Sequence, residues 1–386
     1  MKKQFNAVWL VLLLVSIISC NKRAAPDAAN TLQASHSAPS AASLISVPNI
    51  VFTLAGDTTA GFVDGIGTAA RFNELNGIAI DASGNLFVAD GFNRSIRKVT
   101  AAGVVSTLTG RIDSTGFIAT DGSLGIARFG IPAGLAFDVT GNLFVTDIAS
   151  QRIRVISGDN VGTIAGGSGD TRGPVEFDFA DGGGLKAKFA SPYGIAVDAA
   201  GNLYIGDQGN QRVRRVRGTN IFNALVSTFA GQKSGFLDGQ DTAARFSFPS
   251  GLAIDKAGNI YVADPFNHAV RKITATGLVT TLAGNGTPGF VNGVGRAARF
   301  NSPIAVAVDN AGNVLVADAG NFSIRKITAD GNVTTIAGNG TKGNVDGTAA
   351  GARFTELSGI AVDQTGVIYV TDQHRIRVIT HPTVGH

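Results

Sequence analysis

Apolar residues recur along most of the chain in short runs separated by turn-forming residues. One such stretch is Gly251–Gly284, where Gly251–Asp255, Asn259–Asp264, Val270–Thr274 and Leu278–Leu282 are separated by clusters rich in Gly, Asp, Asn and Pro. Short β-branched runs bounded by such clusters predict strands, and four in succession predict one antiparallel four-stranded sheet.

Two markers show that this pattern occurs six times. One is an Arg-Phe or Lys-Phe dipeptide, and the other is an aspartate that ends the second predicted strand. The dipeptides begin at Arg71, Arg128, Lys188, Arg245, Arg299 and Arg353. The aspartates are Asp90, Asp147, Asp207, Asp264, Asp318 and Asp372, and both series advance by 57, 60, 57, 54 and 54 residues. Four-stranded repeats of this length predict an all-β fold, a six-bladed β-propeller.

The ends of the repeat array predict how the ring closes. The sixth repeat ends after Ile376–Thr380 and lacks a fourth strand, whereas a matching strand at Val51–Gly56 precedes the first repeat. We therefore expect this N-terminal strand to complete the last blade, because closure removes two exposed sheet edges.

Each predicted third strand carries an arginine between apolar neighbours. An arginine packed between blades needs a partner, and the aspartate that ends the second strand precedes it by seven residues, or by five in the last repeat. We expect one partly buried, structural ion pair per blade. The pairs are Asp90–Arg97, Asp147–Arg154, Asp207–Arg214, Asp264–Arg271, Asp318–Arg325 and Asp372–Arg377.

The N-terminus predicts export. Lys2 and Lys3 precede an apolar run, Val8–Ile18, that is too short to span a bilayer comfortably. The following Ser19-Cys20 ends a segment that resembles the bacterial lipobox, and Cys20 is the only cysteine of the chain. Residues 1–19 are thus predicted to be a lipoprotein signal peptide with the lipid on Cys20. An ordinary signal peptide with a chance cysteine is the alternative.

The remaining chain divides by composition. Residues 20–47 are rich in Ala, Ser and Pro and predict a flexible tether, residues 48–381 hold the propeller, and residues 382–386 form a tail. We expect a lipid-anchored protein of the bacterial cell envelope, in the outer membrane. The net charge of +4 is too small to indicate a nucleic-acid partner, and none is expected.

The repeat resembles the NHL repeat, whose pattern G-I-A-V-D-x-x-G-N-L-Y-V-A-D-x-x-N-x-x-I-R-K-I recurs here. It is found at Gly77–Val99, Gly194–Val216, Gly251–Ile273 and Gly359–Ile379. The linking motif G-F-x-D-G-x-x-x-A-A-R-F, at Gly61–Phe72 and Gly235–Phe246, is similar to that of bacterial exported NHL proteins and of teneurins. The resemblance implies a six-bladed propeller, but it leaves function open because relatives include both binding platforms and enzymes.

In a propeller, the connections from strand four to strand one and from strand two to strand three lie on the same face. Loops on a rigid scaffold are common binding sites, and aromatic and arginine side chains are common anchors of interfaces. The expected binding residues are Phe92, Arg94, Tyr193, Arg212, Phe266, His268 and Phe322. They would receive a protein, peptide or glycan, although each Phe can instead serve to cover the gap between blades.

Glu74 and Glu356 stand at equivalent positions just before the first strand of repeats one and six. Ring closure makes these repeats neighbours, so the two carboxylates would share a rim of the central channel and hold a divalent cation, or raise one pKa. Solvated rim residues are the alternative. A non-catalytic binding scaffold without a cofactor is therefore the leading interpretation, and a metal-dependent hydrolase or lyase at the channel is the second. No histidine lies on a first strand, which argues against a three-histidine zinc site there.

Overall fold

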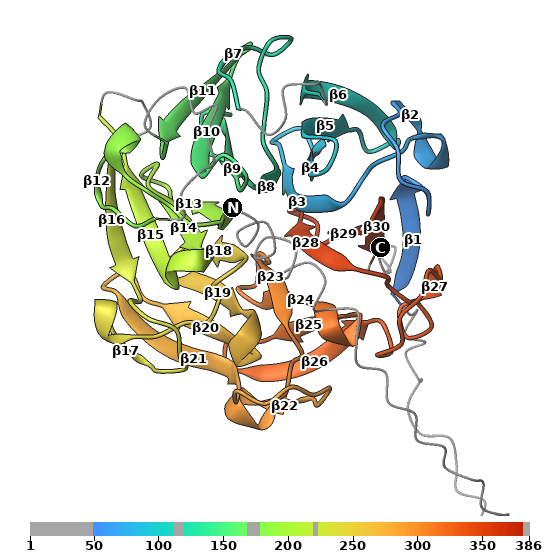
Figure 1. Cartoon of the computed structure of the whole chain (residues 1–386). Helices are drawn as coiled ribbons and strands as arrows, with labels where there is room; N and C mark the ends of the chain where they lie inside the picture. The colour runs from blue at the N-terminus through green and yellow to red at the C-terminus, as the bar shows by residue number, and fades with distance from the viewer. Residues whose placement is uncertain (1–48, 112–118, 168–177, 219–222, 381–386) are drawn as a thin grey trace, which may run out of the picture. The chain divides into compact units, whose positions relative to one another are not determined.

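The computed structural model describes residues 49–111, 119–167, 178–218 and 223–380. The fold described here is that of the unit Pro48–His386. Its described residues form six sheets arranged around a central axis (Figure 1). The all-β six-bladed propeller expected from the repeats is therefore confirmed. None of the helices in the described ranges has the length and apolar content needed to cross a lipid bilayer.

In blades one to five the four main strands run from the axis outward in sequence order, and in blade six a strand from the N-terminus takes the fourth place. In every blade the outermost strand comes from the connection that precedes the blade. Blade one contains β3 (Leu75–Ile80), β4 (Leu86–Asp90), β5 (Ser95–Val99), β6 (Val104–Gly110) and β2 (Gly65–Ile66). Blade two contains β8 (Pro132–Phe137), β9 (Leu143–Asp147), β10 (Arg152–Ser157), β11 (Asn160–Ala165) and β7 (Gly122–Ser123). Blade three contains β13 (Pro192–Val197), β14 (Leu203–Asp207), β15 (Arg212–Arg217), β16 (Leu225–Ala230) and β12 (Gly182–Gly183).

The other three blades repeat this order. Blade four contains β18 (Leu252–Ile254), β19 (Ile260–Asp264), β20 (Ala269–Ile273), β21 (Leu278–Gly284) and β17 (Gly239–Gln240). Blade five contains β23 (Pro303–Val308), β24 (Val314–Asp318), β25 (Ser323–Ile327), β26 (Asn332–Ala337) and β22 (Gly293–Val294). Blade six contains β28 (Leu357–Val362), β29 (Ile368–Asp372), β30 (Arg375–Thr380), β1 (Ile50–Ala55) and β27 (Gly347–Thr348). Short 3-10 helices are η1 (Gly67–Ala69), η2 (Gly184–Lys186), η3 (Gln208–Asn210), η4 (Asp241–Ala243), η5 (Pro265–Asn267), η6 (Gly295–Ala297) and η7 (Ala319–Asn321).

The expectation of four antiparallel strands per blade is wrong by one strand. A two-residue strand from the connecting segment pairs with the outer edge of each described sheet, as Gly65 does with Val105 in blade one. Two residues are too few for hydrophobic alternation to be visible in sequence. The extra strand covers an edge that would otherwise present unpaired backbone groups.

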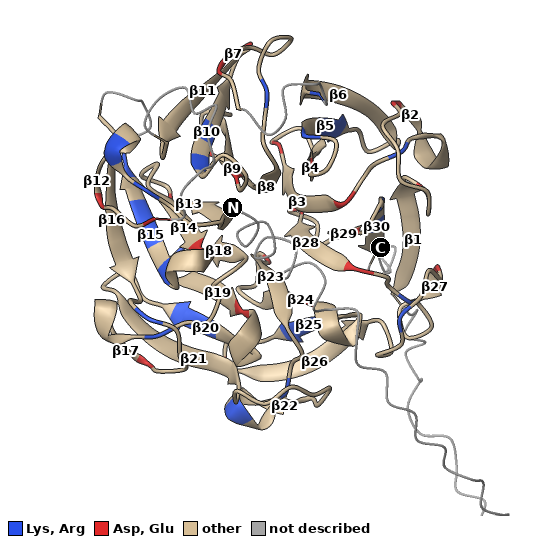
Figure 2. Ribbon diagram, viewed as in Figure 1, with Lys and Arg blue, Asp and Glu red and all other residues tan. Residues whose placement is uncertain are grey.

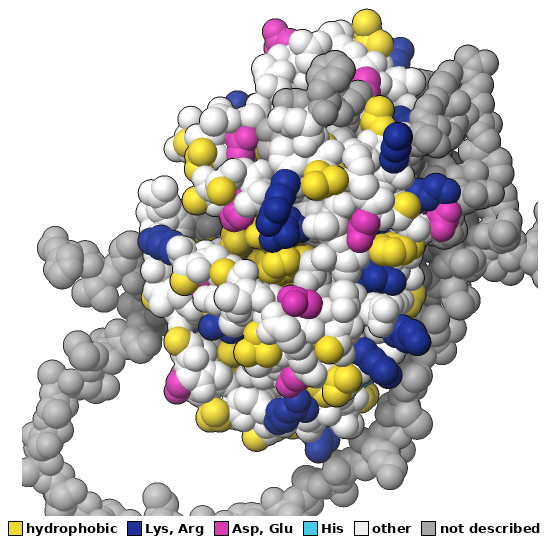
Figure 3. Space-filling view, turned by 90° about the vertical axis from the view of Figure 1, so that its left-hand side faces the viewer, with side chains coloured by type: hydrophobic (Ala, Val, Ile, Leu, Met, Phe, Trp, Pro, Cys, Tyr) yellow, Lys and Arg dark blue, Asp and Glu magenta, His cyan; other side chains and the backbone are white. Residues whose placement is uncertain are grey.

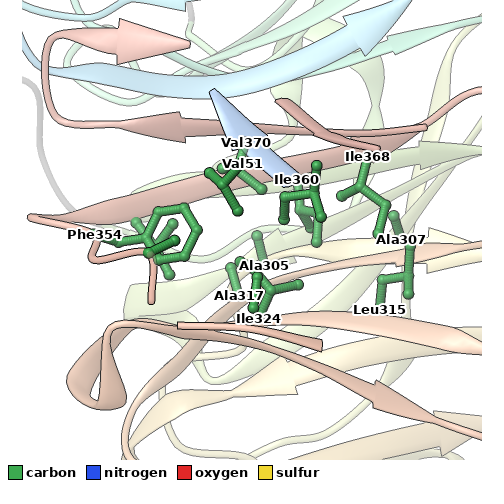
Figure 4. Close-up of a cluster of buried hydrophobic side chains, with 14 of the residues drawn as sticks. Val51, Ala305, Ala307, Leu315, Ala317, Ile324, Phe354, Ile360, Ile368 and Val370 are labelled. Carbon is green, nitrogen blue, oxygen red and sulfur yellow. The ribbon is translucent and has the colours of Figure 1, made fainter. Parts of the chain in front are cut away.

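Ring closure by the N-terminal strand is confirmed. β1 pairs antiparallel with β30, from Ile50 opposite Thr380 to Ala55 opposite Ile376. Its fully buried Val51 lies beside Val370 and Ile360 of blade six and faces blade five (Figure 4). The closing strand thus supplies core residues as well as backbone hydrogen bonds.

The hydrophobic core lies between blades. Each of six buried clusters combines residues of two neighbouring blades, and the cluster around Phe72 joins blade six to blade one. Near the axis the backbones approach closely, since a Cβ on Gly77 would lie 2.4 Å from the Ala133 carbonyl oxygen of the next blade. A side chain at residue 77 would therefore force the neighbouring backbone to shift.

We expect Val51→Ala to lower the free energy of unfolding by about 2 kcal/mol, because loss of buried methyl groups leaves a cavity. Denaturant titration would measure it. Val104→Ala, at an exposed residue of β6, is the control and should change stability by less than about 0.5 kcal/mol. Equal effects of the two substitutions would contradict the assigned place of β1.

Candidate functional site

Every described blade contains one arginine that is fully buried in its third strand. In blade one, Arg97 Nη1 lies 2.6 Å from Asp90 Oδ2, and both side chains are inaccessible to solvent. Figure 2 shows Lys and Arg in blue on β5, β10, β15, β20 and β25, the strands that carry five of these arginines. The structure brings together all six expected pairs. The N–O distances are 2.6 Å for Arg97, 3.6 Å for Arg154, 2.7 Å for Arg214, 2.9 Å for Arg271, 2.8 Å for Arg325 and 2.9 Å for Arg377.

A second acceptor holds the other end of each guanidinium. Arg97 Nη2 donates to Asp64 Oδ1 at 2.6 Å and to the Val63 carbonyl oxygen at 3.0 Å, and Nη1 donates to the Arg71 carbonyl oxygen. The equivalent acceptors are Asp121, Asp181, Asp238, Asn292 and Asp346. Sequence reasoning missed this residue, although it precedes its arginine by 33 residues in five blades and by 31 in the sixth.

Aromatic rings flank the same guanidinium. The Arg97 Cζ atom lies 4.9 Å from the ring centroid of Phe62 and 5.0 Å from that of Phe72, a geometry that favours cation–π attraction. Phe72 is buried, whereas Phe62 is 43% exposed. Four residues of the linking motif thus contact Arg97: Phe62, Asp64, Arg71 through its carbonyl oxygen, and Phe72. This shared contact explains why the motif recurs with the blades.

The outer ring varies among the blades. Phe179, Phe236 and Phe290 occupy the place of Phe62 over the arginines of blades three, four and five. Blades two and six have Ala119 and Asn344 at this position. Phe62, Phe179 and Phe290 each leave more than a third of the side chain exposed, so these rings are both held in place and accessible.

The turns between second and third strands connect neighbouring blades. His268 Nδ1 accepts a hydrogen bond from the backbone N–H of Ser302 in the next blade, at 3.1 Å, and burial lowers the pKa of His268. Gln211 plays the same part toward Phe248. Phe322 is half-buried and packs on the cluster between blades five and six. Side chains at this turn position therefore connect neighbouring blades, by a hydrogen bond or by packing.

The expected binding residues consequently differ in accessibility. Phe266 is 46% exposed and its ring meets that of Phe248 edge to face at a centroid distance of 4.9 Å. Arg212 stacks over Phe179 with its Cζ atom 3.9 Å from the ring centroid. Phe92 and Arg94 are half-buried in the first blade's turn.

Glu74, Glu356 and His374 meet where blade six adjoins blade one. The Glu74 backbone N–H donates to His374 Nδ1 at 3.1 Å, and His374 Nε2 lies 3.8 Å from Glu74 Oε1. Burial and the charge of Glu74 raise the pKa of Glu356 to about 6. Burial and the charge of Glu356 also raise the pKa of Tyr193. The Glu74 carboxylate is therefore close enough to influence the ionisation of Glu356.

The predicted cation site at Glu74 and Glu356 gains no further ligand among the described residues. Within the described ranges, no group of three or more His, Cys, Asp or Glu side chains is placed to hold a metal ion. The contact of His374 with Glu74 was not foreseen, because His374 lies in a shortened turn about 300 residues away in sequence.

The comparisons with known proteins match the repeat architecture. The model of the NHL repeat matches residues 246–273 and 300–327. "Protein SUPPRESSOR OF QUENCHING 1, chloroplastic" of Arabidopsis thaliana is 28% identical over 317 residues, which are 76% of this chain and 29% of that protein. "NHL repeat-containing protein 2" of Gallus gallus is 32% identical over 152 residues, 38% of this chain and 21% of that protein. The chain thus spans less than a third of the length of these relatives.

Among solved structures, an "auxiliary nutrient binding protein from Bacteroides ovatus" superposes with a TM-score of 0.64 at 18% identity, covering 86% of this chain and 76% of that one. At this identity the likeness shows the fold alone. The ring of sheets, each with a buried arginine, defines the chain as a six-bladed β-propeller built from one repeated blade. Blades four and five match the NHL repeat, so the chain is a β-propeller that contains NHL repeats.

We expect Asp264→Ala to lower the free energy of unfolding by roughly 3–5 kcal/mol, because Arg271 would lose its fully buried carboxylate and keep only the partly exposed one of Asp238. Burial raises the pKa of Asp264 to about 6. Because this pKa is still below 7, the carboxyl group is ionised at neutral pH. Thermal and denaturant unfolding would measure the loss.

Asp238→Asn is the matched control, since blade five carries Asn292 at this position and should tolerate the amide. Its expected loss is below about 1 kcal/mol. An unchanged melting temperature of Asp264→Ala would rule out a structural role for the pair.

Proposed function

We propose that this chain is a non-catalytic binding scaffold whose partner docks on the face that carries the long inter-blade connections. The observation that carries the proposal is the set of accessible phenylalanine rings held over buried arginines, Phe62, Phe179 and Phe290, together with Phe266. A protein, peptide or glycan offers the apolar surface or C–H groups that such rings can cover.

Rigidity makes these rings suited to binding. Phe62 is held by the guanidinium of Arg97, and the Gly61 carbonyl beside it accepts a hydrogen bond from Asn93 of the neighbouring turn, at 2.7 Å. A side chain that is already ordered loses little conformational entropy when a partner covers it. The same arrangement recurs in blades three and five, so a partner would meet several fixed rings.

The opposite face is less available for recognition. Its hairpin turns between first and second strands use their aspartates internally, as Asp255 accepts from the backbone N–H groups of Ala257 and Asn259 and from Asn259 Nδ2. Carboxylates occupied in this way have fewer lone pairs left for a ligand. Polar recognition is therefore favoured on the face of the long connections.

Charge does not direct the choice of partner. Basic, acidic and apolar side chains are interspersed on the flank that carries β11, β12 and β16 (Figure 3). With a net charge of only +4, long-range steering of an anionic polymer would be weak. The proposal therefore rests on short-range contacts, and nucleic acid is not the proposed partner.

Export and lipid anchoring are part of the proposal. They rest on the sequence before residue 21, because Cys20 and the tether lie outside the described residues. A scaffold attached to the outer membrane through Cys20 would present the propeller to partners in the cell envelope. The description of the Bacteroides ovatus structure as a nutrient binding protein agrees with a binding role.

Metabolic labelling with palmitate tests the anchor. The wild-type chain should carry label and sediment with membranes, whereas Cys20→Ala should do neither, because the thiol is the only one in the chain that can be lipidated. Label on the variant, or an unlabelled wild type, would refute the anchor without affecting the binding proposal.

Phe266→Ala tests the binding face. Immobilised propeller is incubated with envelope extract, and we expect the variant to retain at least about fivefold less of any partner retained by the wild type, as for loss of an anchor worth ~1 kcal/mol. Leu278→Ala, a similarly exposed apolar residue at the other end of the same blade, is the control and should retain as much as wild type. Equal retention by wild type and Phe266→Ala would count against this face.

A further inference from the structure

Among the described residues, a side chain of one blade accepts a hydrogen bond from the backbone of the next blade at four junctions of the ring. The acceptor stands in the turn between the second and third strands, and the N–H donor lies shortly before the next first strand. The acceptor–donor pairs are Gln151 with Ser191 at 2.6 Å, Gln211 with Phe248 at 2.7 Å, His268 with Ser302 at 3.1 Å and His374 with Glu74 at 3.1 Å. Glutamine and histidine serve the same purpose here, but only histidine changes its charge near neutral pH.

His268 can accept this hydrogen bond only while its ring is neutral. Nδ1 faces the Ser302 N–H, so the single proton of the neutral ring is on Nε2. Protonation adds a hydrogen to Nδ1, and both ring nitrogens are then donors. Two N–H groups would face each other, so the bond between blades four and five would be lost.

Both ends of this bond have backbone conformations that need support from their surroundings. The φ angles are 46° at His268 and 50° at Ser302, in the left-handed region that is costly for residues other than glycine. The Ser302 N–H has no acceptor besides His268 among the described residues. Loss of the bond would therefore leave a strained residue and an unsatisfied N–H together at this junction.

The surroundings of His268 favour the neutral ring. Burial lowers the pKa of His268 below the ordinary histidine value of about 6.5, and it is the only cause of the shift. The charged groups on the strands packed around the turn are bonded to one another within each blade, Asp264 to Arg271 and Asp318 to Arg325. No charge therefore compensates a proton on His268.

His374 makes the same kind of bond in a different setting. Its Nε2 lies 3.8 Å from the Glu74 carboxylate, which would attract a charged ring and offset the lost hydrogen bond. The residue that faces His268 is Ser302, which is neutral. The junction of blades four and five is therefore the one where acid has no compensating attraction.

The turn that His268 ends also carries Phe266. The 3-10 helix η5 spans Pro265–Asn267, and the His268 N–H closes it by donating to the Pro265 carbonyl oxygen at 3.1 Å. Phe266 is the exposed ring of this turn and one of the proposed binding residues. The bond from Ser302 to His268 thus ties the turn beneath this ring to blade five.

We propose that the His268–Ser302 hydrogen bond is an acid-sensitive contact, and that protonation of His268 frees the Phe266 turn from blade five. Weaker partner docking at acidic pH would follow, and that consequence rests on the proposed function. The folded chain binds this proton less readily than the unfolded chain. The stabilisation is therefore complete above about pH 6.5 and is lost as the pH falls below that value.

Amide hydrogen exchange of the full chain, followed by NMR, tests the bond without a partner. Ser191 is the internal reference, because it also precedes a proline and its acceptor Gln151 does not titrate. After correction for the intrinsic effect of pH, the exchange rate of Ser302 relative to Ser191 should rise at least about tenfold between about pH 7.5 and about pH 5.

Two substitutions at His268 separate its charge from its hydrogen bond. His268→Gln keeps an acceptor, as Gln211 does, and should remove most of the acid response of Ser302. His268→Phe has no acceptor and should give fast exchange at Ser302 at both pH values. Acid also protonates Asp264 and Asp318, whose pKa values are about 6, but it does so in wild type and variants alike. The difference between wild type and His268→Gln therefore isolates the histidine.

An equal acid response of Ser302 in wild type and His268→Gln, or no response in wild type, would overturn the proposal. The docking consequence is measured with envelope extract, where acid should reduce partner retention at least about threefold more in wild type than in His268→Gln. Equal losses would refute that consequence. If Phe266→Ala retains as much partner as wild type, the proposed function fails while the exchange result at Ser302 still stands. Failure of the exchange test leaves the proposed function unaffected.

Discussion

The buried guanidinium at the centre of each blade is the interaction on which the rest of the propeller depends. Arg97 joins the end of the second strand, through Asp90, to the segment that enters the blade, through Asp64 and two backbone carbonyl oxygens. Removing one partner of a buried charge is strongly destabilising, so Arg97 depends on both carboxylates as well as on the two carbonyl oxygens. The arginine thereby fixes the position of a long connection that has little regular structure of its own.

This constraint also explains how the connections can present a binding face. Loops usually lie on the surface and are more mobile than the elements they join. Here Phe62 and Phe72 enclose Arg97 from two sides, so one ring is buried in the inter-blade core while the other remains accessible. The same contacts that stabilise the blade therefore order the aromatic surface.

Function in such a ring is most readily sought where one blade departs from the others. Blade six borrows its fourth strand from the N-terminus, has a shorter turn before Arg375, and carries Asn344 where four blades have phenylalanine. Its junction with blade one also holds Glu74 and Glu356, two of the three glutamates in the chain. Closure of the ring concentrates these differences at a single seam, because only there do the two ends of the array meet.

The sequence by itself determined the number of blades, the closing role of residues 51–56 and the identity of the six aspartate–arginine pairs, since all three follow from a repeated spacing and a period of two. It did not reveal the two-residue outer strands, which are too short to show a period, or the contact of Asp64 with Arg97. The meeting of Glu74 with His374 was decided only by the tertiary structure. These groups are hundreds of residues apart, and their distance depends on ring closure and side-chain packing, which no local pattern encodes.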